Sequence, residues 1–119
     1  MTKPTDAYPD DYPEEYITGK VNFFGREFRV TPDVLIPRLE TEALVRRARK
    51  VLKDQKFQKV IDIGSGSGII GTSVADLIDT VIFLDISPGA LEIAEENFRK
   101  HFREKNAEFI LSDLLIQVQ

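Results

Sequence analysis

The chain has 119 residues, 42% of them hydrophobic and 30% charged, which supports one globular unit with a real core and excludes a disordered chain. Its net charge of −4 excludes a basic field for nucleic acid, and the absence of Cys with a single His101 excludes disulfides, thiolate chemistry and a zinc site. No apolar run approaches the roughly 18 residues of a membrane span and no signal peptide opens the chain, so we expect a cytoplasmic protein without a metal.

The first segment, residues 1–15, is proline-rich and acidic. Its three prolines disfavour a regular helix or strand, and we expect an extended acidic arm. The next segment, residues 16–38, contains K-V-N-F-F-G-R-E-F-R-V from Lys20, with aromatic residues on both sides of Gly25. This pattern predicts a β-hairpin followed by a connecting segment.

A helix is predicted to begin near Thr41. Apolar residues recur there at helical spacing, at Leu44, Val45, Ala48, Val51 and Leu52. The arginines and lysines between them form the opposite face. We interpret that face as solvent-exposed surface rather than as a binding site, because solvated basic helix faces are common.

After Lys59, short β-branched runs alternate with helical patterns. The runs are Val60–Ile63, Val81–Leu84 and Ala107–Leu111, and the helical patterns are Ile69–Ile78 and Pro88–Phe102. This β-α-β-α-β alternation predicts a parallel sheet. Because an open α/β domain with both faces of its sheet covered usually needs upward of roughly 150 residues, we expect the sheet to be incomplete and to end after its third strand.

A glycine-rich turn follows the first of these strands, in the sequence V-I-D-I-G-S-G-S-G from Val60. Glycines at alternate positions permit positive φ and let a ligand lie directly against the main chain, at the carboxyl edge where such sheets bind ligands. A tight strand-to-helix turn without a ligand would need glycines too. The turn alone therefore leaves both interpretations open.

A second feature is Asp85, which ends the strand after the glycine turn. A carboxylate at this point can accept both hydroxyls of a ribose, which indicates a nucleoside cofactor. The alternative is that Asp85 only caps the helix beginning at Ser87.

Two cofactor classes fit this arrangement. Residues 66–71 also satisfy G-x-G-x-x-G, so a nicotinamide cofactor remains an alternative. Asp62, an acid just before the glycines, favours S-adenosyl-L-methionine, because its carboxylate can orient the loop and attract the cationic methionyl end. Asp113 follows the third strand at the same edge, where it or Leu114 can border an adenine ring.

Four upstream segments make the pattern more specific. They are Y-I-T-G from Tyr16, F-G-R-E-F-R-V from Phe24, V-L-I-P-R from Val34 and E-T-E from Glu40. Together with D-I-G-S-G-S-G, they resemble the HemK family, the glutamine methyltransferases that modify peptide chain release factors. The resemblance covers about residues 16–115.

The resemblance implies a Rossmann-like class I methyltransferase fold, with residues 39–119 as the N-terminal half of that domain. It implies S-adenosyl-L-methionine as cofactor, a release factor as protein substrate, and lid segments formed by the hairpin and residues 38–42. The implied cofactor-binding residues are Gly64, Ser65, Gly66, Ser67, Gly68, Asp85, Asp113 and Leu114.

The chain also departs from the family pattern. Leu39 stands where Pro is common, the N-terminal helical domain is missing, and the N-P-P-Y segment that positions the glutamine amide does not occur in the 119 residues. We therefore assign no catalytic residue and expect this chain to be inactive by itself. A non-catalytic cofactor-binding module is a further alternative. The uncovered edge of the first strand, residues 60–63, predicts self-association.

Overall fold

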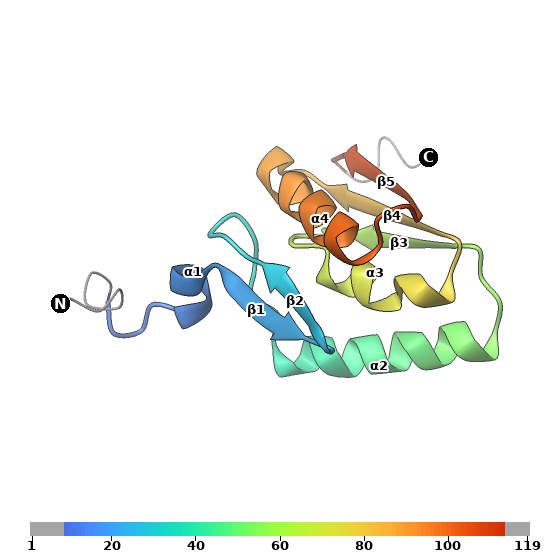
Figure 1. The fold of residues 1–119 in the computed structure, drawn as a ribbon, viewed down its shortest axis with the longest axis horizontal. Helices are drawn as coiled ribbons and strands as arrows, with labels where there is room; N and C mark the ends of the chain where they lie inside the picture. The colour runs from blue at the N-terminus through green and yellow to red at the C-terminus, as the bar shows by residue number, and fades with distance from the viewer. Residues whose placement is uncertain (1–8, 114–119) are drawn as a thin grey trace.

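A computed structural model describes residues 9–113 (Figure 1). The elements follow the predicted order. They are α1 (Glu14–Thr18), β1 (Lys20–Phe23), β2 (Arg26–Arg29), α2 (Leu39–Asp54), β3 (Lys59–Ile63), α3 (Ile69–Val74) with a 3-10 turn (Ala75–Leu77), β4 (Thr80–Asp85), α4 (Pro88–His101) and β5 (Asn106–Leu111). None of the helices within residues 9–113 is long and apolar enough to cross a bilayer.

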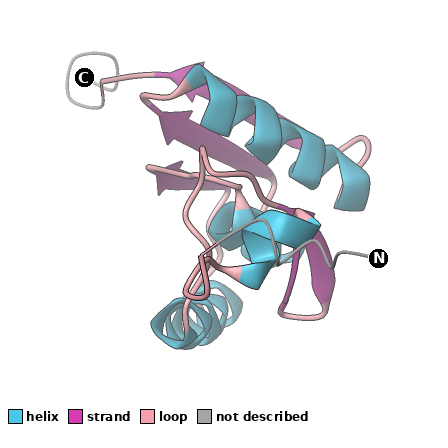
Figure 2. Cartoon of the chain, turned by 90° about the vertical axis from the view of Figure 1, so that its left-hand side faces the viewer, coloured by secondary structure: helices cyan, strands magenta, loops and turns pink. Residues whose placement is uncertain are grey.

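The sheet has the order β3-β4-β5 with both pairs parallel, which confirms the predicted alternation. Its core face is apolar because Val81 and Phe83 pack there against α4. Helix α3 contacts both α2 and α4, and Figure 2 views α2 nearly end-on, away from α4. On the other face, Ile61 and Ile63 of β3 are 45% and 57% exposed. In the described part of the chain β3 is an edge strand, and self-association through it stays a prediction.

The hairpin forms as the sequence predicts. Strands β1 and β2 pair antiparallel, and the two turn residues, Phe24 and Gly25, have φ of 49° and 81°. Two successive positive φ values are typical of the tight hairpin turns that match strand twist. Phe23 and Phe28 are buried against Val45 of α2, so the hairpin is anchored on the helical layer.

The start of the chain differs from the expected extended arm. Residues 1–8 lie outside the described residues, but α1 begins at Glu14, so the expectation is wrong for residues 14–15. Pro13 stands at the N-cap, where a missing N–H costs no intrahelical bond, and Gly19 ends the helix with φ 76°. A proline before a short helix is therefore compatible with it.

Helix α2 buries less of its apolar face than its periodicity predicts. Only Val45 is fully buried, whereas Leu44 and Val51 are 54% and 38% exposed. The reason is tertiary: α2 packs mainly on α3 and the 3-10 turn, which cover one narrow stripe.

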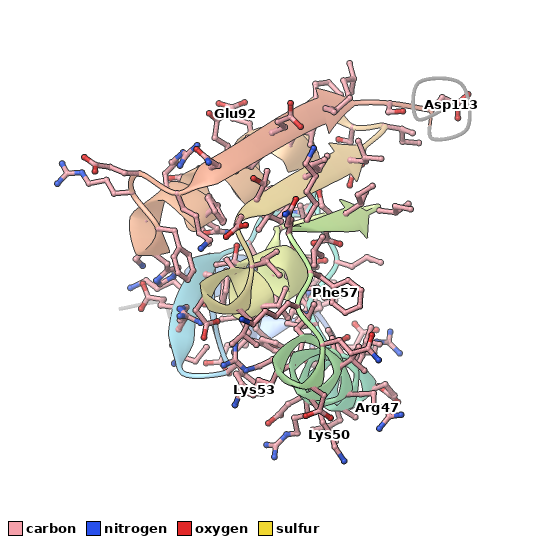
Figure 3. The ribbon with its side chains drawn as sticks, turned by 90° about the vertical axis from the view of Figure 1, so that its right-hand side faces the viewer. Arg47, Lys50, Lys53, Phe57, Glu92 and Asp113 are labelled. Atoms are coloured by element: carbon pink, nitrogen blue, oxygen red, sulfur yellow. The ribbon has the colours of Figure 1, made fainter. Side chains whose placement is uncertain are left out.

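The basic face of α2 is largely solvent-exposed, as predicted. Figure 3 shows Arg47, Lys50 and Lys53 on the side of α2 turned away from the sheet. Arg49 is different, because its guanidinium donates to both carboxylate oxygens of Asp76, at 2.6 and 3.0 Å. The interpretation of the basic face as free surface is wrong for Arg49, which fastens α2 to the 3-10 turn that follows α3.

Candidate functional site

The glycine loop, residues 64–68, leaves β3 at its carboxyl end. Gly64, Gly66 and Gly68 all have positive φ, at 67°, 53° and 78°. The main-chain N–H groups of Gly64 and Ser65 donate to the Leu84 carbonyl at 2.8 and 3.0 Å. The loop is therefore fixed to the end of the neighbouring strand β4.

The space beside this loop is open. A Cβ added to Gly64 would meet no heavy atom within 4 Å, and one added to Gly66 would have Val34 Cβ as its nearest neighbour, at 4.0 Å. The glycines are therefore required here by backbone conformation and not by crowding within the protein.

Asp85 connects this loop to α4. Its Oδ2 accepts from the Gly66 N–H at 2.9 Å and its Oδ1 accepts from the Ser87 N–H at 3.0 Å. Ser87 in turn caps α4 by accepting from the Ala90 N–H at 3.2 Å. Asp85 thus supports the helix start and also holds the glycine loop. Each of its oxygens keeps a further lone pair for a ligand donor.

The loop and Asp85 form one side of a hollow of about 250 Å³. Gly64, Ser65, Gly66 and Ser67 line it together with Asp85. Ser65 Oγ is buried and has no hydrogen-bond partner among residues 9–113. The hollow therefore offers bare main chain and a carboxylate, which suit an elongated polar ligand with hydroxyl donors.

The segment between the hairpin and α2 forms the opposite side of the hollow. Its lining residues are Asp33, Val34, Leu35 and Pro37, and Thr41 from the first turn of α2 lines the hollow beside them. The Tyr16 hydroxyl donates to the Val34 carbonyl at 2.6 Å, and the Val34 side chain packs against Ala90 of α4. Helix α1 and α4 therefore hold this segment over the glycine loop. Sequence reasoning did not find Asp33, because a loop carboxylate without periodic neighbours gives no pattern.

Two of the predicted residues do not line the hollow, and a third is not described. Gly68 starts α3 and does not line the hollow, since a Cβ there would lie 3.1 Å from the Cα and Cβ of Ala94. Asp113 is exposed beyond the end of β5, as Figure 3 shows, and is not among the lining residues. Leu114 lies outside the described residues. Across the described range 9–113, no group of three or more His, Asp or Glu side chains could hold a metal.

Asp62 lies beneath the site, not in it. Its carboxylate is buried and accepts from the Gly71 N–H of α3 at 3.0 Å, so it contacts the helix after the loop and not the loop itself. Burial, assisted by the nearby Asp85 carboxylate, raises the pKa of Asp62 to about 7. The expectation of a full negative charge facing the ligand therefore needs correction, because near neutral pH the group is only partly ionised.

This raised pKa predicts a pH-dependent stability. Since the folded state binds the proton more tightly than the unfolded state, Asp62 stabilises the fold below about pH 4, and this contribution is lost as the pH rises through about 7. We expect Asp62→Asn to gain melting temperature relative to the wild type between pH 5 and 8, on the order of 4–8 °C for each kcal/mol of difference.

Asp76→Asn is the matched control for this measurement by thermal unfolding. The Arg49 guanidinium lowers the pKa of Asp76, so its contribution is lost only as the pH falls below the ordinary aspartate range. The Asp76 variant should therefore differ from the wild type by a constant amount between pH 5 and 8. An equally constant difference for Asp62→Asn would contradict a pKa near 7.

Comparisons with known proteins identify the family of the chain. Residues 40–119 match the methyltransferase small domain family. Relatives named release factor glutamine methyltransferase include that of Koribacter versatilis, 41% identical over 90% of this chain and 38% of the relative, and that of Borreliella burgdorferi, 44% identical over 92% and 39%. That of Bacillus subtilis is 39% identical over 92% and 40%. The chain spans about two fifths of the length of the curated relatives it matches.

Two solved structures share the fold. One is the Pyrococcus abyssi tRNA (uracil-54, C5)-methyltransferase in complex with S-adenosyl-L-homocysteine, with a TM-score of 0.60, 23% identity, and coverage of 78% of this chain and 23% of that one. The other is a SAM-dependent methyltransferase from Agrobacterium tumefaciens, with a TM-score of 0.62, 17% identity, and coverage of 77% and 31%.

Proposed function

The chain belongs to the methyltransferase small domain family, and from this premise we propose that it binds S-adenosyl-L-methionine in the hollow beside the glycine loop. The observation that carries the proposal is the convergence of Asp85 and the bare main chain of residues 64–66 on one hollow. This is the edge at which the carboxyl ends of parallel strands bind ligands in open α/β sheets.

The residues present fit this cofactor. Asp85 has acceptor capacity left for the ribose hydroxyls. Gly64 and Gly66 carry no side chain where the methionyl part would pass. The adenine contact with Asp113 and Leu114 stays a prediction, because Asp113 does not line the hollow and Leu114 lies outside the described residues. When bound, the cofactor supplies an electrophilic methyl group on a sulfonium.

The proposed reaction is methyl transfer to the side-chain amide nitrogen of a glutamine in a peptide chain release factor. Its support is the name shared by relatives that are 39–44% identical. An amide nitrogen is a poor nucleophile, so its transfer step depends on positioning. We assign the described residues to cofactor binding and none of them to the amide. The family match does not favour the nicotinamide alternative.

The test is thermal unfolding with two ligands. S-adenosyl-L-homocysteine should raise the unfolding free energy by about 2.7 kcal/mol at one hundred times its dissociation constant, since it binds only the folded state. NAD at the same concentration should leave the melting temperature unchanged. Stabilisation by NAD and none by S-adenosyl-L-homocysteine would overturn the proposal in favour of the oxidoreductase.

Asp85→Ala should weaken S-adenosyl-L-homocysteine binding by about 1.5–3 kcal/mol, the scale for losing hydrogen bonds to a charged acceptor. Titration calorimetry measures the effect, with circular dichroism to check the fold. Asp79→Ala is the matched control, because Asp79 is exposed just before β4 at its opposite end. Equal affinity in both variants would mean that Asp85 does not bind the ligand.

A further inference from the structure

Helix α4 has one polar residue on its buried face. The other buried residues of that face are apolar or small, among them Ala94 and Phe98, whereas Asn97 is 1% exposed. A buried carboxamide costs free energy unless its hydrogen bonds are made, so its partners indicate what it holds.

Asn97 bonds two segments that are far apart in the sequence. Its Oδ1 accepts from the Arg29 N–H at 2.7 Å, and its Nδ2 donates to the Arg29 carbonyl at 2.9 Å and to the Ser67 carbonyl at 2.8 Å. Arg29 ends strand β2 of the hairpin, and Ser67 belongs to the glycine loop. One side chain therefore joins the hairpin to the loop that lines the hollow.

A second contact places the same face of α4 against the loop. A Cβ added to Gly68 would lie 3.1 Å from both Cα and Cβ of Ala94. Ala94 and Asn97 are three residues apart, which puts them on one face of the helix. The end of the glycine loop thus rests on α4 at two adjacent residues, one packed against it and one bonded to it.

We propose that Asn97 is a positioning residue that couples docking of the hairpin to cofactor binding. It fixes the Ser67 carbonyl, and through it the loop, only while its other hydrogen bonds hold the Arg29 main chain. This inference rests on the proposed cofactor function. Because such linkage is reciprocal, bound cofactor should also hold the hairpin more firmly on α4.

The hairpin has other contacts with α4 that do not reach the loop. Arg29 pairs with Glu96 at 2.6 Å and Lys100 pairs with Glu27 at 3.1 Å, and all four side chains are about half exposed. Glu96 therefore provides a matched control next to Asn97. Phe98 provides a second control, since it is buried in the core cluster with Phe83 and outside the hollow.

The experiment measures S-adenosyl-L-homocysteine affinity by calorimetry in four variants. Asn97→Asp keeps the acceptor oxygen and loses both donated hydrogen bonds. Asn97→Ser shortens the side chain so that it cannot span Arg29 and Ser67, and it buries no charge. Both should weaken binding at least about tenfold. Glu96→Gln and Phe98→Leu should stay within about twofold of the wild type, although Phe98→Leu lowers the melting temperature. If Asn97→Asp does not fold, Asn97→Ser gives the result.

Hydrogen exchange of the Arg29 amide supplies a readout that lost stability alone does not produce. S-adenosyl-L-homocysteine should slow this exchange in the wild type and not in the Asn97 variants. Wild-type affinity in a folded Asn97 variant would overturn the coupling, as would equal weakening by Phe98→Leu at the same melting temperature. Absence of binding in the wild type would instead contradict the proposed function itself.

Discussion

Replacing Gly66 with Val is expected to abolish S-adenosyl-L-homocysteine binding in a chain that still folds. Gly66 has φ of 53°, a conformation that β-branched residues rarely adopt, and its N–H is held by Asp85 at 2.9 Å. The added side chain would extend into open space beside Val34, which is the space proposed for the ligand. Strain and occupied volume therefore act together on the same site.

Gly25→Val separates these two effects. Gly25 has φ of 81° at the tip of the hairpin, and a Cβ there meets nothing within 4 Å, so the variant carries comparable backbone strain without touching the hollow. Both variants should lose stability, on the order of 1–3 kcal/mol, but only Gly66→Val should lose binding in titration calorimetry. Wild-type affinity in Gly66→Val would mean that the ligand does not lie against this loop.

The sequence predicts the part of the site that is local in the chain. The strand ending at Ile63, the glycines after it and the acid at Asp85 each give a pattern within a few residues, and parallel strands bring their carboxyl ends to one edge. The structure brings Gly64, Gly66 and Asp85 to one hollow. These positions were predictable because topology fixes them once the strand order is known.

The parts that the sequence did not predict depend on contacts between distant segments. Asn97 stands in a helical apolar pattern, and its bonds to Arg29 and Ser67 span 68 and 30 residues. A polar residue at a buried helical position was a usable signal for Asn97. No sequence pattern indicated that Asp33 lines the hollow. The exposure of Leu44 was unpredictable for the same reason, because periodicity gives a face but not what covers it.

Gly71 illustrates why the glycine motif alone left the cofactor open. It supplies the third glycine of G-x-G-x-x-G, yet it does not line the hollow. A Cβ at Gly71 would lie 2.5 Å from Cε1 of Phe83 and 3.0 Å from Cγ1 of Val81. Its requirement is close packing of α3 against β4, which a nicotinamide fold and a methyltransferase fold share. The third glycine therefore indicates the type of fold and does not identify the ligand.

Gly71→Ala is accordingly expected to destabilise the fold by about 1–3 kcal/mol through overpacking, despite the better helix propensity of Ala. Phe83 cannot easily move away, since its ring is fully buried and stacks on Phe109 at 5.0 Å with an edge contact to Phe98 at 5.4 Å. Denaturant unfolding measures the change.

Gly89→Ala is the matched helical control for Gly71→Ala, because its Cβ would stay 3.4 Å or more from the atoms around it. It should leave the stability unchanged or raise it by up to about 1 kcal/mol, through helix propensity alone. The double variant Gly71→Ala with Phe83→Leu provides the decisive comparison. Phe83→Leu alone opens a cavity beside α3, and the methyl group added by Gly71→Ala would partly occupy the space that the ring gives up. The two free-energy losses should therefore be less than additive, as expected for residues in direct contact. Strict additivity would mean that Phe83 is not what excludes a side chain at position 71, and the packing explanation of the third glycine would fail with it.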